Sequence, residues 1–275
     1  MSVSRRDLAE LSRVALTVAD QAAAILASGY RSRPHADEKG RADLVTEFDR
    51  RSEAFVIEQL SRLTPEIPVI GEEQSGGHDS RPRGLVWYVD PLDGTSNFVH
   101  GHPFFNVSIG LMWADQPVAG AVVAPALALR YRGFHAPGDG GEAFRNDERC
   151  EVSPVASLAK SMVGTGFPPN REVAPANNFG SFIDVKRAAQ AVRRCGAAAL
   201  DVCFVADGTY EGFWERHLHA WDVCAAASMV LAAGGRVTAL DGGPADYHAG
   251  HVVVSNGKIH DDLVVAIQRG EGRAV

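Results

Sequence analysis

The stretch WYVDPLDGTSNF, residues 87–98, places two aspartates three positions apart directly after an apolar run. Residues 85–89, LVWYV, predict a buried strand, and a strand that ends in Asp90 delivers that carboxylate to its C-terminal edge, where open α/β sheets bind their ligands. Pro91 fixes its own φ and stiffens the turn, so Asp93 comes round close to Asp90. The stretch therefore predicts a pair of carboxylates at one edge of a sheet.

The residues after this pair suit a phosphate group. Gly94 allows the backbone to approach a ligand closely, and residues 95–97, TSN, suit the first turn of a helix, whose free N–H groups favour an anion. Two carboxylates repel a phosphate unless hard cations such as Mg²⁺, which prefer oxygen ligands, lie between them. Asp-Pro and Asp-Gly are also ordinary turn formers, so this stretch alone fits an acidic turn equally well.

Acids elsewhere in the chain favour the phosphate and metal interpretation. The segment IGEE, residues 70–73, places Glu72 after a short strand, and Asp49 stands at the start of a predicted helix. Asp222 falls in the first turn of another helix, where a lone aspartate usually serves as a cap or dipole partner. Haloacid-dehalogenase-like phosphatases carry D-x-D-G-T, whereas the two aspartates here are three apart, which argues against an aspartyl nucleophile.

Size and composition indicate a globular protein. The 275 residues allow one large domain or two tightly packed ones, and an apolar content of 45% suffices for a large core. The net charge is −7 and no basic stripe with interleaved aromatic residues appears, which argues against a nucleic-acid partner. The overall field would mildly repel an anionic substrate, so an anion site needs a local source of positive charge, such as bound cations.

Cysteine usage and the N-terminus bear on the compartment. The four cysteines form no C-x-x-C pair and are sparse for this length, which favours a reducing cytosol over a disulfide framework. The tract after Arg5 and Arg6 is interrupted by polar residues, so we expect neither a signal peptide nor a membrane span.

The hydrophobic pattern changes character along the chain. Helical spacing predicts a helix that Gly29 ends and a second one from about Thr46 to residue 63, and residues 106–149 have the texture of successive strands. Beyond residue 152 strands and helices alternate. We therefore expect an α+β protein of stacked layers with a soft boundary near 150, residues 1–150 supplying most of the acids and 151–275 completing the site as one packed unit.

These segments resemble the inositol monophosphatase family of Mg²⁺-dependent, lithium-sensitive sugar phosphatases. The resemblance covers nearly the whole chain, and each segment alone is only modestly specific, whereas five or six in order at compatible spacings are highly specific. The matching segments are KGRADLVTEFD (39–49), IGEE (70–73), WYVDPLDGTSNFVHGHPFFNVSIGL (87–111), GTGFP (164–168), RRCGAAALDVCFVADGTYEGFWE (193–215) and WDVCAAA (221–227). The resemblance implies a mixed α/β, five-layer αβαβα sandwich that is usually dimeric.

The resemblance also implies the metal ligands and the water-activating pair. Glu72, Asp90 and the carbonyl of Leu92 match the ligands of one Mg²⁺. Asp90, Asp93 and Asp222 match those of a second, and a third, weaker ion leans on the position of Glu72. In members of the family, the residues at the positions of Asp49 and Thr95 orient and deprotonate the attacking water.

Substrate contacts are implied in the same way. Gly94, Thr95 and the adjacent Ser96 are expected to bind the phosphate, with Lys39 as a basic residue nearby. Gly196, Ala198 and Glu215 match positions that line the hydroxyl-bearing ring of the substrate. Three positions depart from the family pattern and bear on substrate choice and dimer details rather than on metal binding: Ala197, Ala226 and Ala232.

The expected function is Mg²⁺-dependent hydrolysis of a small phosphomonoester by a cytoplasmic homodimer. Inositol-1-phosphate or a related polyol phosphate is the first candidate substrate, and histidinol phosphate is the second. Fructose 1,6-bisphosphate and a nucleotide 3′-phosphate are further alternatives. A non-catalytic binding or regulatory relative would be expected to lack a metal ligand, and all of the matched acids are present here.

Overall fold

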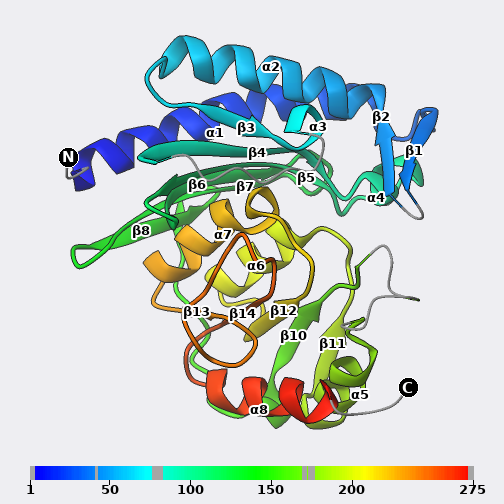
Figure 1. The fold of residues 1–275 in the computed structure, drawn as a ribbon, viewed down its shortest axis with the longest axis vertical. Helices are drawn as coiled ribbons and strands as arrows, with labels where there is room; N and C mark the ends of the chain where they lie inside the picture. Colours follow the sequence, from blue (N-terminus) through cyan, green and yellow to red (C-terminus); the bar gives the residue numbers. More distant parts are fainter. Residues whose placement is uncertain (1–3, 41–42, 76–82, 169–171, 173–176, 272–275) are drawn as a thin grey trace.

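The computed structural model describes residues 4–40, 43–75, 83–168, 172 and 177–271. Its layers follow one another as helices, sheet, helices, sheet and helices (Figure 1), which confirms the expected mixed α/β sandwich. Within the described residues, no helix combines the length and the apolar character needed to cross a lipid bilayer.

Two long helices form the first layer, as the periodicity predicted. They are α1 (Arg5–Gly29) and α2 (Glu47–Leu63), and they pack against each other over one face of the large sheet (Figure 1). Ser4 begins α1 through a reciprocal pair of hydrogen bonds with Asp7. The apolar side chains that α1 buries recur every three or four residues: Leu8, Ala15, Val18, Ala22 and Leu26.

The large sheet has seven strands in the order β3-β4-β5-β6-β7-β8-β9. All neighbours are antiparallel except β3 and β4. A 3-10 turn, η1 (Pro125–Leu127), joins β6 to β7. The strands are β3 (Val69–Gly71), β4 (Leu85–Asp93), β5 (Asn106–Trp113), β6 (Gln116–Ala124), β7 (Leu129–Ala136), β8 (Gly140–Arg145) and β9 (Glu148–Arg149).

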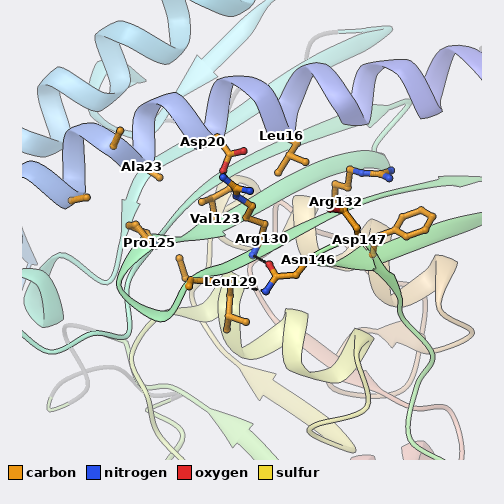
Figure 2. A pocket seen from close by; sticks show the side chains of 15 residues that line it. Leu16, Asp20, Ala23, Val123, Pro125, Leu129, Arg130, Arg132, Asn146 and Asp147 are labelled. Carbon is orange, nitrogen blue, oxygen red and sulfur yellow. Dashed lines mark hydrogen bonds and ion pairs between the residues drawn. The ribbon is translucent and has the colours of Figure 1, made fainter.

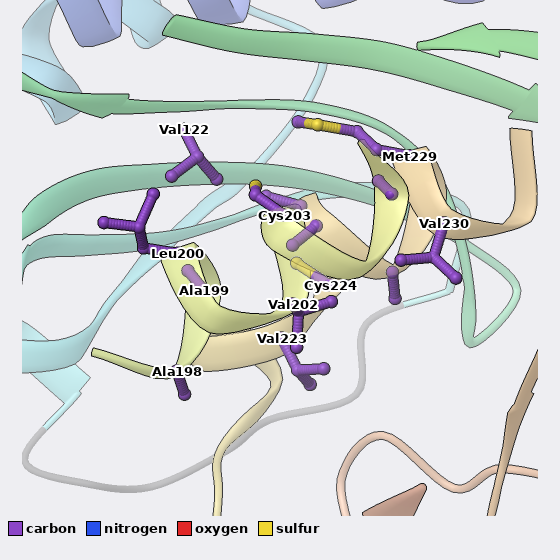
Figure 3. Close-up of a cluster of buried hydrophobic side chains, with 14 of the residues drawn as sticks. Val122, Ala198, Ala199, Leu200, Val202, Cys203, Val223, Cys224, Met229 and Val230 are labelled. Atoms are coloured by element: carbon purple, nitrogen blue, oxygen red, sulfur yellow. The ribbon is translucent and has the colours of Figure 1, made fainter. Parts of the chain in front are cut away.

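The middle layer consists of α6 (Ala198–Ala206) and α7 (Ala220–Ala232), whose apolar side chains form one buried cluster with the inner face of the large sheet (Figure 3). Gly110, Gly120 and Gly133 lie side by side on β5, β6 and β7 and form a glycine groove that receives α7. A Cβ on Gly120 would lie 2.7 Å from the Cα of Ala225, so only glycine permits this approach. The groove therefore fixes the position of α7, and with it Asp222, against the large sheet.

A smaller sheet and a last pair of helices complete the fold. The sheet has five strands in the order β11-β10-β12-β14-β13, in which β14 runs antiparallel to both neighbours. Helices α5 (Phe179–Ala188) and α8 (His260–Glu271) cover its far face (Figure 1). Its elements are η2 (Leu158–Lys160), β10 (Met162–Thr165), β11 (Ala191–Arg193), β12 (Gly212–Glu215), β13 (Arg236–Thr238) and β14 (Val252–Ser255).

The structure differs from the sequence-based expectation in three places. A hairpin of β1 (Ala36–Gly40) and β2 (Asp43–Thr46) precedes α2 and was not predicted, because strands this short and mostly polar show no apolar alternation. The short β13 was also not predicted. Strand β4 does not end at Asp90 but resumes its pairing at Asp93, where it faces Asn106 across one irregularity in the register.

His260 makes the packing of α8 sensitive to acid. Its Nε2 lies 2.8 Å from Thr238 Oγ1 and its Nδ1 2.8 Å from Ser255 Oγ, and the side chain is fully buried. Burial, followed by the charge of Arg236, lowers the pKa of His260 from 6.5 to about 4. The unfolded chain therefore binds a proton near pH 6.5 that the folded chain rejects until about pH 4, so stability falls as the pH drops through this window.

We expect His260→Gln to remove this part of the acid sensitivity. Between pH 7 and pH 4, wild type should lose on the order of 3 kcal/mol more unfolding free energy than the variant. Urea unfolding at several pH values measures the difference, and His100→Gln, at an exposed histidine, serves as the matched control. An identical pH profile for His260→Gln and wild type would contradict the prediction.

Candidate active site

The segment from Asp90 to Asp93 lies at a bulge in β4. Pairing with β5 runs to Asp90 opposite Ser108 and resumes with Asp93 opposite Asn106, so β4 carries one extra residue there. Tyr88 packs in the cluster under α6 and α7, and strand alternation places Asp90 on that same face. The backbone N–H of Leu92 donates to Asp90 Oδ1 at 3.0 Å, which fixes the carboxylate inside the turn.

Asp93 is held by the first turn of α6. Its Oδ2 accepts hydrogen bonds from Asn106 Nδ2 at 2.8 Å and from Ala199 N at 2.9 Å, and its Oδ1 accepts from Ala198 N at 3.2 Å. The residue that precedes α6, Ala197, has no side-chain acceptor of its own, so Asp93 supplies the missing cap. Burial raises the pKa of Asp93 to about 6, although these three hydrogen bonds oppose the shift.

Asp222 lies in the first turn of α7, where it completes the start of its own helix. Its Oδ2 accepts from His219 N at 2.6 Å, and its charge acts on the buried carboxyl group of Asp90. The His219 ring stacks on Trp221 with centroids 4.5 Å apart, which holds the turn before α7 in place. The structure thus brings together the two aspartates that are more than a hundred residues apart in the sequence.

Glu72 reaches this cluster from α3 (Glu72–Ser75), a single turn directly after β3. Glu53 on α2 holds that turn, because its Oε1 accepts from Glu73 N at 2.7 Å and from Gln74 N at 3.2 Å. Gly71 permits the contact, since a Cβ there would collide with the Glu53 carboxylate. The charge of Glu72 acts on all three aspartates of the cluster, Asp90, Asp93 and Asp222.

Burial and the charge of Glu72 destabilise the charged forms of the three aspartates in this cluster. Burial, followed by the charge of Glu72, raises the pKa of Asp90 and of Asp222 well above the usual value for an aspartate. Buried like charges are compensated either by protonation or by a cation, and the carboxylate and carbonyl oxygens here are ligands that Mg²⁺ and Ca²⁺ prefer. The donor set therefore fits a hard divalent cation, although no three His, Cys, Asp or Glu side chains of the described residues already converge in ligand geometry.

Asp49 and Thr95 form a second unit beside the acids. Asp49 belongs to the reciprocal cap of α2, where its Oδ2 accepts from the N and the Oγ1 of Thr46 at 2.8 and 2.6 Å. Thr95 Oγ1 lies 2.9 Å from Asp49 Oδ1 and 3.0 Å from the carbonyl oxygen of Leu92. Burial raises the pKa of Asp49, so this carboxylate is a better proton acceptor than an exposed one.

The predicted phosphate segment begins α4 (Thr95–Val99). Gly94 adopts φ = 90°, a left-handed conformation in which other residues are strained, and a Cβ there would lie 3.0 Å from Phe104 O. Ser96 is exposed in the first turn. Asn97 Nδ2 donates to Phe104 O at 2.6 Å and to Cys195 O at 2.9 Å, which ties α4 to the loop before α6.

The three residues predicted to line the substrate ring lie on the C-terminal side of the site. Gly196 adopts φ = 86° beside Asn97 and the Arg194 guanidinium, and Ala198 is the first residue of α6. Glu215 ends β12 next to Gly166, where a Cβ would collide with its carboxylate. Burial, followed by the charges of Asp201 and Asp222, raises the pKa of Glu215 well above its usual value.

One predicted residue cannot be placed, and several neighbours were not predicted. The side chain of Lys39 lies outside the described part of the structure. Asn106, Glu53 and Asp201 were not identified from the sequence. Asn106 and Glu53 hold the acids, while Asp201, 1% exposed, lies close enough for Asp93 to raise its pKa after the larger effect of burial. Asn106 and Asp201 show in the sequence only as polar residues in apolar segments, and Glu53 only as one of several acids on an amphipathic helix.

Comparison with known proteins agrees with this geometry. The sequence model of the inositol monophosphatase family matches residues 7–273. An inositol-1-monophosphatase of Synechocystis is 41% identical over 84% of this chain and 79% of its own length. The Nus factor SuhB of Pseudomonas aeruginosa is 36% identical over 84% of this chain and 85% of its own length.

A solved structure extends the likeness to the fold. The structure of inositol monophosphatase from Anabaena is 36% identical and superposes with a TM-score of 0.85, covering 96% of this chain and 97% of the other. Because both chains are covered almost completely, the likeness includes the layers on both sides of the acid cluster.

Proposed function

The chain belongs to the inositol monophosphatase family and is a phosphoric monoester hydrolase, and from that premise we propose that it hydrolyses a small polyol phosphate with Mg²⁺ as cofactor. The observation that carries the proposal is the cluster of Glu72, Asp90, Asp93 and Asp222, in which burial and the charge of Glu72 raise the pKa of all three aspartates. A divalent cation would balance that charge and leave the acids ionised at neutral pH.

The proposed ligands are the side chains of these four acids and the carbonyl of Leu92. Asp90 belongs to both of the ion positions that the family resemblance implies, whereas Asp93 and Asp222 belong to the second alone. When bound, Mg²⁺ would neutralise phosphate charge and lower the pKa of a water molecule. The hydrogen bonds that Asp93 and Asp222 accept at helix starts hold their side chains ready for this role.

The residues Thr95 and Asp49 are proposed to handle the attacking water. Thr95 Oγ1 donates its single proton to Asp49 Oδ1, and its lone pairs then accept a hydrogen bond from the water. Asp49, with its pKa raised by burial, receives the proton as the water attacks phosphorus in line. The N–H groups of Gly94 and Thr95 would bind the phosphate oxygens.

The leaving group would lie toward the C-terminal half of the site. In this proposal Gly196 and Ala198, which carry no bulky side chain, leave room for a ring, and Glu215 at the end of β12 accepts hydrogen bonds from its hydroxyl groups. This lining favours inositol-1-phosphate or a related polyol phosphate, with histidinol phosphate as the second candidate. From the family resemblance we also propose that the enzyme binds two or three Mg²⁺ ions and is inhibited by Li⁺. The same resemblance suggests a homodimer in the cytoplasm.

Phosphate release from a substrate panel tests the proposal. The panel contains inositol-1-phosphate, histidinol phosphate, fructose 1,6-bisphosphate and a nucleotide 3′-phosphate, each with Mg²⁺ and with EDTA. We expect release that requires Mg²⁺, with the highest kcat/KM on inositol-1-phosphate, and restored activity when Mg²⁺ is returned. Activity that survives EDTA would refute the metal assignment, and a folded protein that releases phosphate from none of the panel would indicate a binding protein.

A further inference from the structure

A hollow lies on the outer side of the large sheet, between α1 and strands β7 and β8 (Figure 2). Its volume is about 520 Å³, within the range of pockets that hold small molecules. The acid cluster lies on the other face of the same sheet, since Asp90 faces the middle helices. This hollow is therefore separate from the candidate active site.

The hollow exists because small residues of α1 face long side chains of the sheet. Tyr131 packs in the buried cluster that α6 and α7 form with the inner face of the large sheet. Strand alternation therefore points its neighbours Arg130 and Arg132 of β7 to the other face, toward α1. Phe144 of β8 lies directly opposite Arg132 of β7, so its side chain also points toward α1. On its side, α1 presents a row of alanines, Ala23, Ala24 and Ala27, which cannot fill the space.

The two arginines of the hollow differ in how they are compensated. Arg130 Nε forms an ion pair with Asp20 Oδ1 at 2.8 Å, across from α1. Arg132 stacks on the Phe144 ring, with Cζ 4.2 Å from its centroid, and within the described residues no carboxylate lies within ion-pair distance of it. Burial, followed by the charge of Arg13, lowers its pKa, and the more distant Asp147 and Glu142 act the other way.

The rim of the hollow is fixed by hydrogen bonds of the Asn146 side chain and backbone. Arg130 N donates to Asn146 Oδ1 at 2.9 Å, Asn146 N donates to Arg130 O at 2.8 Å, and Asn146 Nδ2 donates to Ala128 O at 3.0 Å. These bonds hold the turn after η1 against the turn after β8. A site whose walls are fixed before binding loses little conformational entropy when a ligand enters.

We propose that this hollow binds a small amphipathic anion, with a flat apolar ring against the alanine row of α1 and its anionic group on the guanidinium of Arg132. The stack on Phe144 holds the guanidinium plane in one orientation, which suits two parallel hydrogen bonds to a sulfonate, phosphate or carboxylate. The half-buried position of Arg132 makes such a charge pair stronger than one at the open surface.

Isothermal titration calorimetry with naphthalene-2-sulfonate tests the proposal, because a phosphatase cannot hydrolyse a sulfonate. Naphthalene-2-sulfonamide has the same ring without the charge and is the neutral probe. We expect one sulfonate per chain and an affinity about tenfold above that of the sulfonamide. Arg132→Met, which keeps the packing on Phe144, should lower sulfonate affinity about tenfold and leave the sulfonamide unchanged.

Three further variants locate the binding. Ala24→Phe fills the apolar side of the hollow and should weaken both probes, whereas Arg62→Met removes an exposed arginine of α2 and should change neither. Asp93→Asn alters the candidate active site and should also change neither. The proposal is overturned if the sulfonate does not bind, if Arg132→Met binds it as tightly as wild type, if Ala24→Phe leaves both affinities intact, or if Asp93→Asn alone removes binding.

Discussion

Asp93→Asn is expected to abolish phosphate release while the protein stays folded. The change removes one negative charge from the proposed ion site, and kcat/KM should fall on the order of 10³-fold or more, because several kcal/mol of charge stabilisation are lost. Asparagine keeps the size of the side chain and one oxygen that can accept from Ala199 N–H. Mg²⁺-dependent phosphate release and the thermal unfolding midpoint, measured on the same preparation, check both halves of this expectation.

Asp184→Asn is the matched control for this variant. Asp184 is a buried acid on α5, away from the acid cluster, so the same substitution should leave turnover near wild type. Near-normal turnover in Asp93→Asn would remove Asp93 from the proposed ligands. A loss of activity together with unfolding in Asp93→Asn would show instead that its hydrogen bonds to α6 are needed for the fold.

Gly120→Ala is expected to destabilise the protein strongly and to lower activity with it. The new Cβ would lie 2.7 Å from the Cα of Ala225 and 2.8 Å from the carbonyl oxygen of Ile109, so it meets backbone on both sides. Overpacking of this kind costs about 1–3 kcal/mol, which lowers the melting temperature of a chain this long by about 3–10 °C. Because α7 must move away from the glycine groove, Asp222 moves with it, and kcat/KM should fall further than stability alone explains.

Gly138→Ala separates crowding from loss of glycine itself. Gly138 has φ = 82° with no atom within 4 Å of a Cβ placed there, so alanine meets only the strain of a left-handed residue, about 1–2 kcal/mol. We expect this variant to keep the kcat/KM of wild type. If Gly120→Ala retained wild-type kcat/KM, the glycine groove would not position Asp222. Differential scanning calorimetry and phosphate release on both variants make the comparison.

Local patterns predicted most of the fold. Helices α1, α2 and α7 and strand β4 can be recognised from the sequence alone. The spacing of their apolar residues shows whether one face of the element is buried or the whole of it. The hairpin of β1 and β2 carries no such signal, since its two strands are too short and too polar to show an apolar alternation and depend on each other for pairing. The bulge in β4 was missed for the same reason, because it exists only in the pairing with β5.

For the candidate site, the sequence suggests which residues take part more readily than it suggests which residues touch one another. Asp90 and Asp93 stand in a recognisable local motif, whereas the approach of Asp222 to Asp90 has no local signal in the sequence. The support of Asp93 by Asn106 and of α3 by Glu53 depends on register between strands and on packing between layers. Such contacts follow from tertiary structure and leave no spacing that a single sequence reveals.

Three helix starts meet at the candidate site, and each is completed by one of its acids: Asp49 at α2, Asp93 at α6 and Asp222 at α7. The hydrogen bonds that Asp93 accepts from Ala198 and Ala199 join residues more than a hundred positions apart, so forming them closes a long loop at a cost in chain entropy. Contacts of such high sequence separation slow folding. During refolding, helical structure should therefore return before the acids are assembled, and recovery of phosphate release would be a stricter measure of the native state than recovery of helix content.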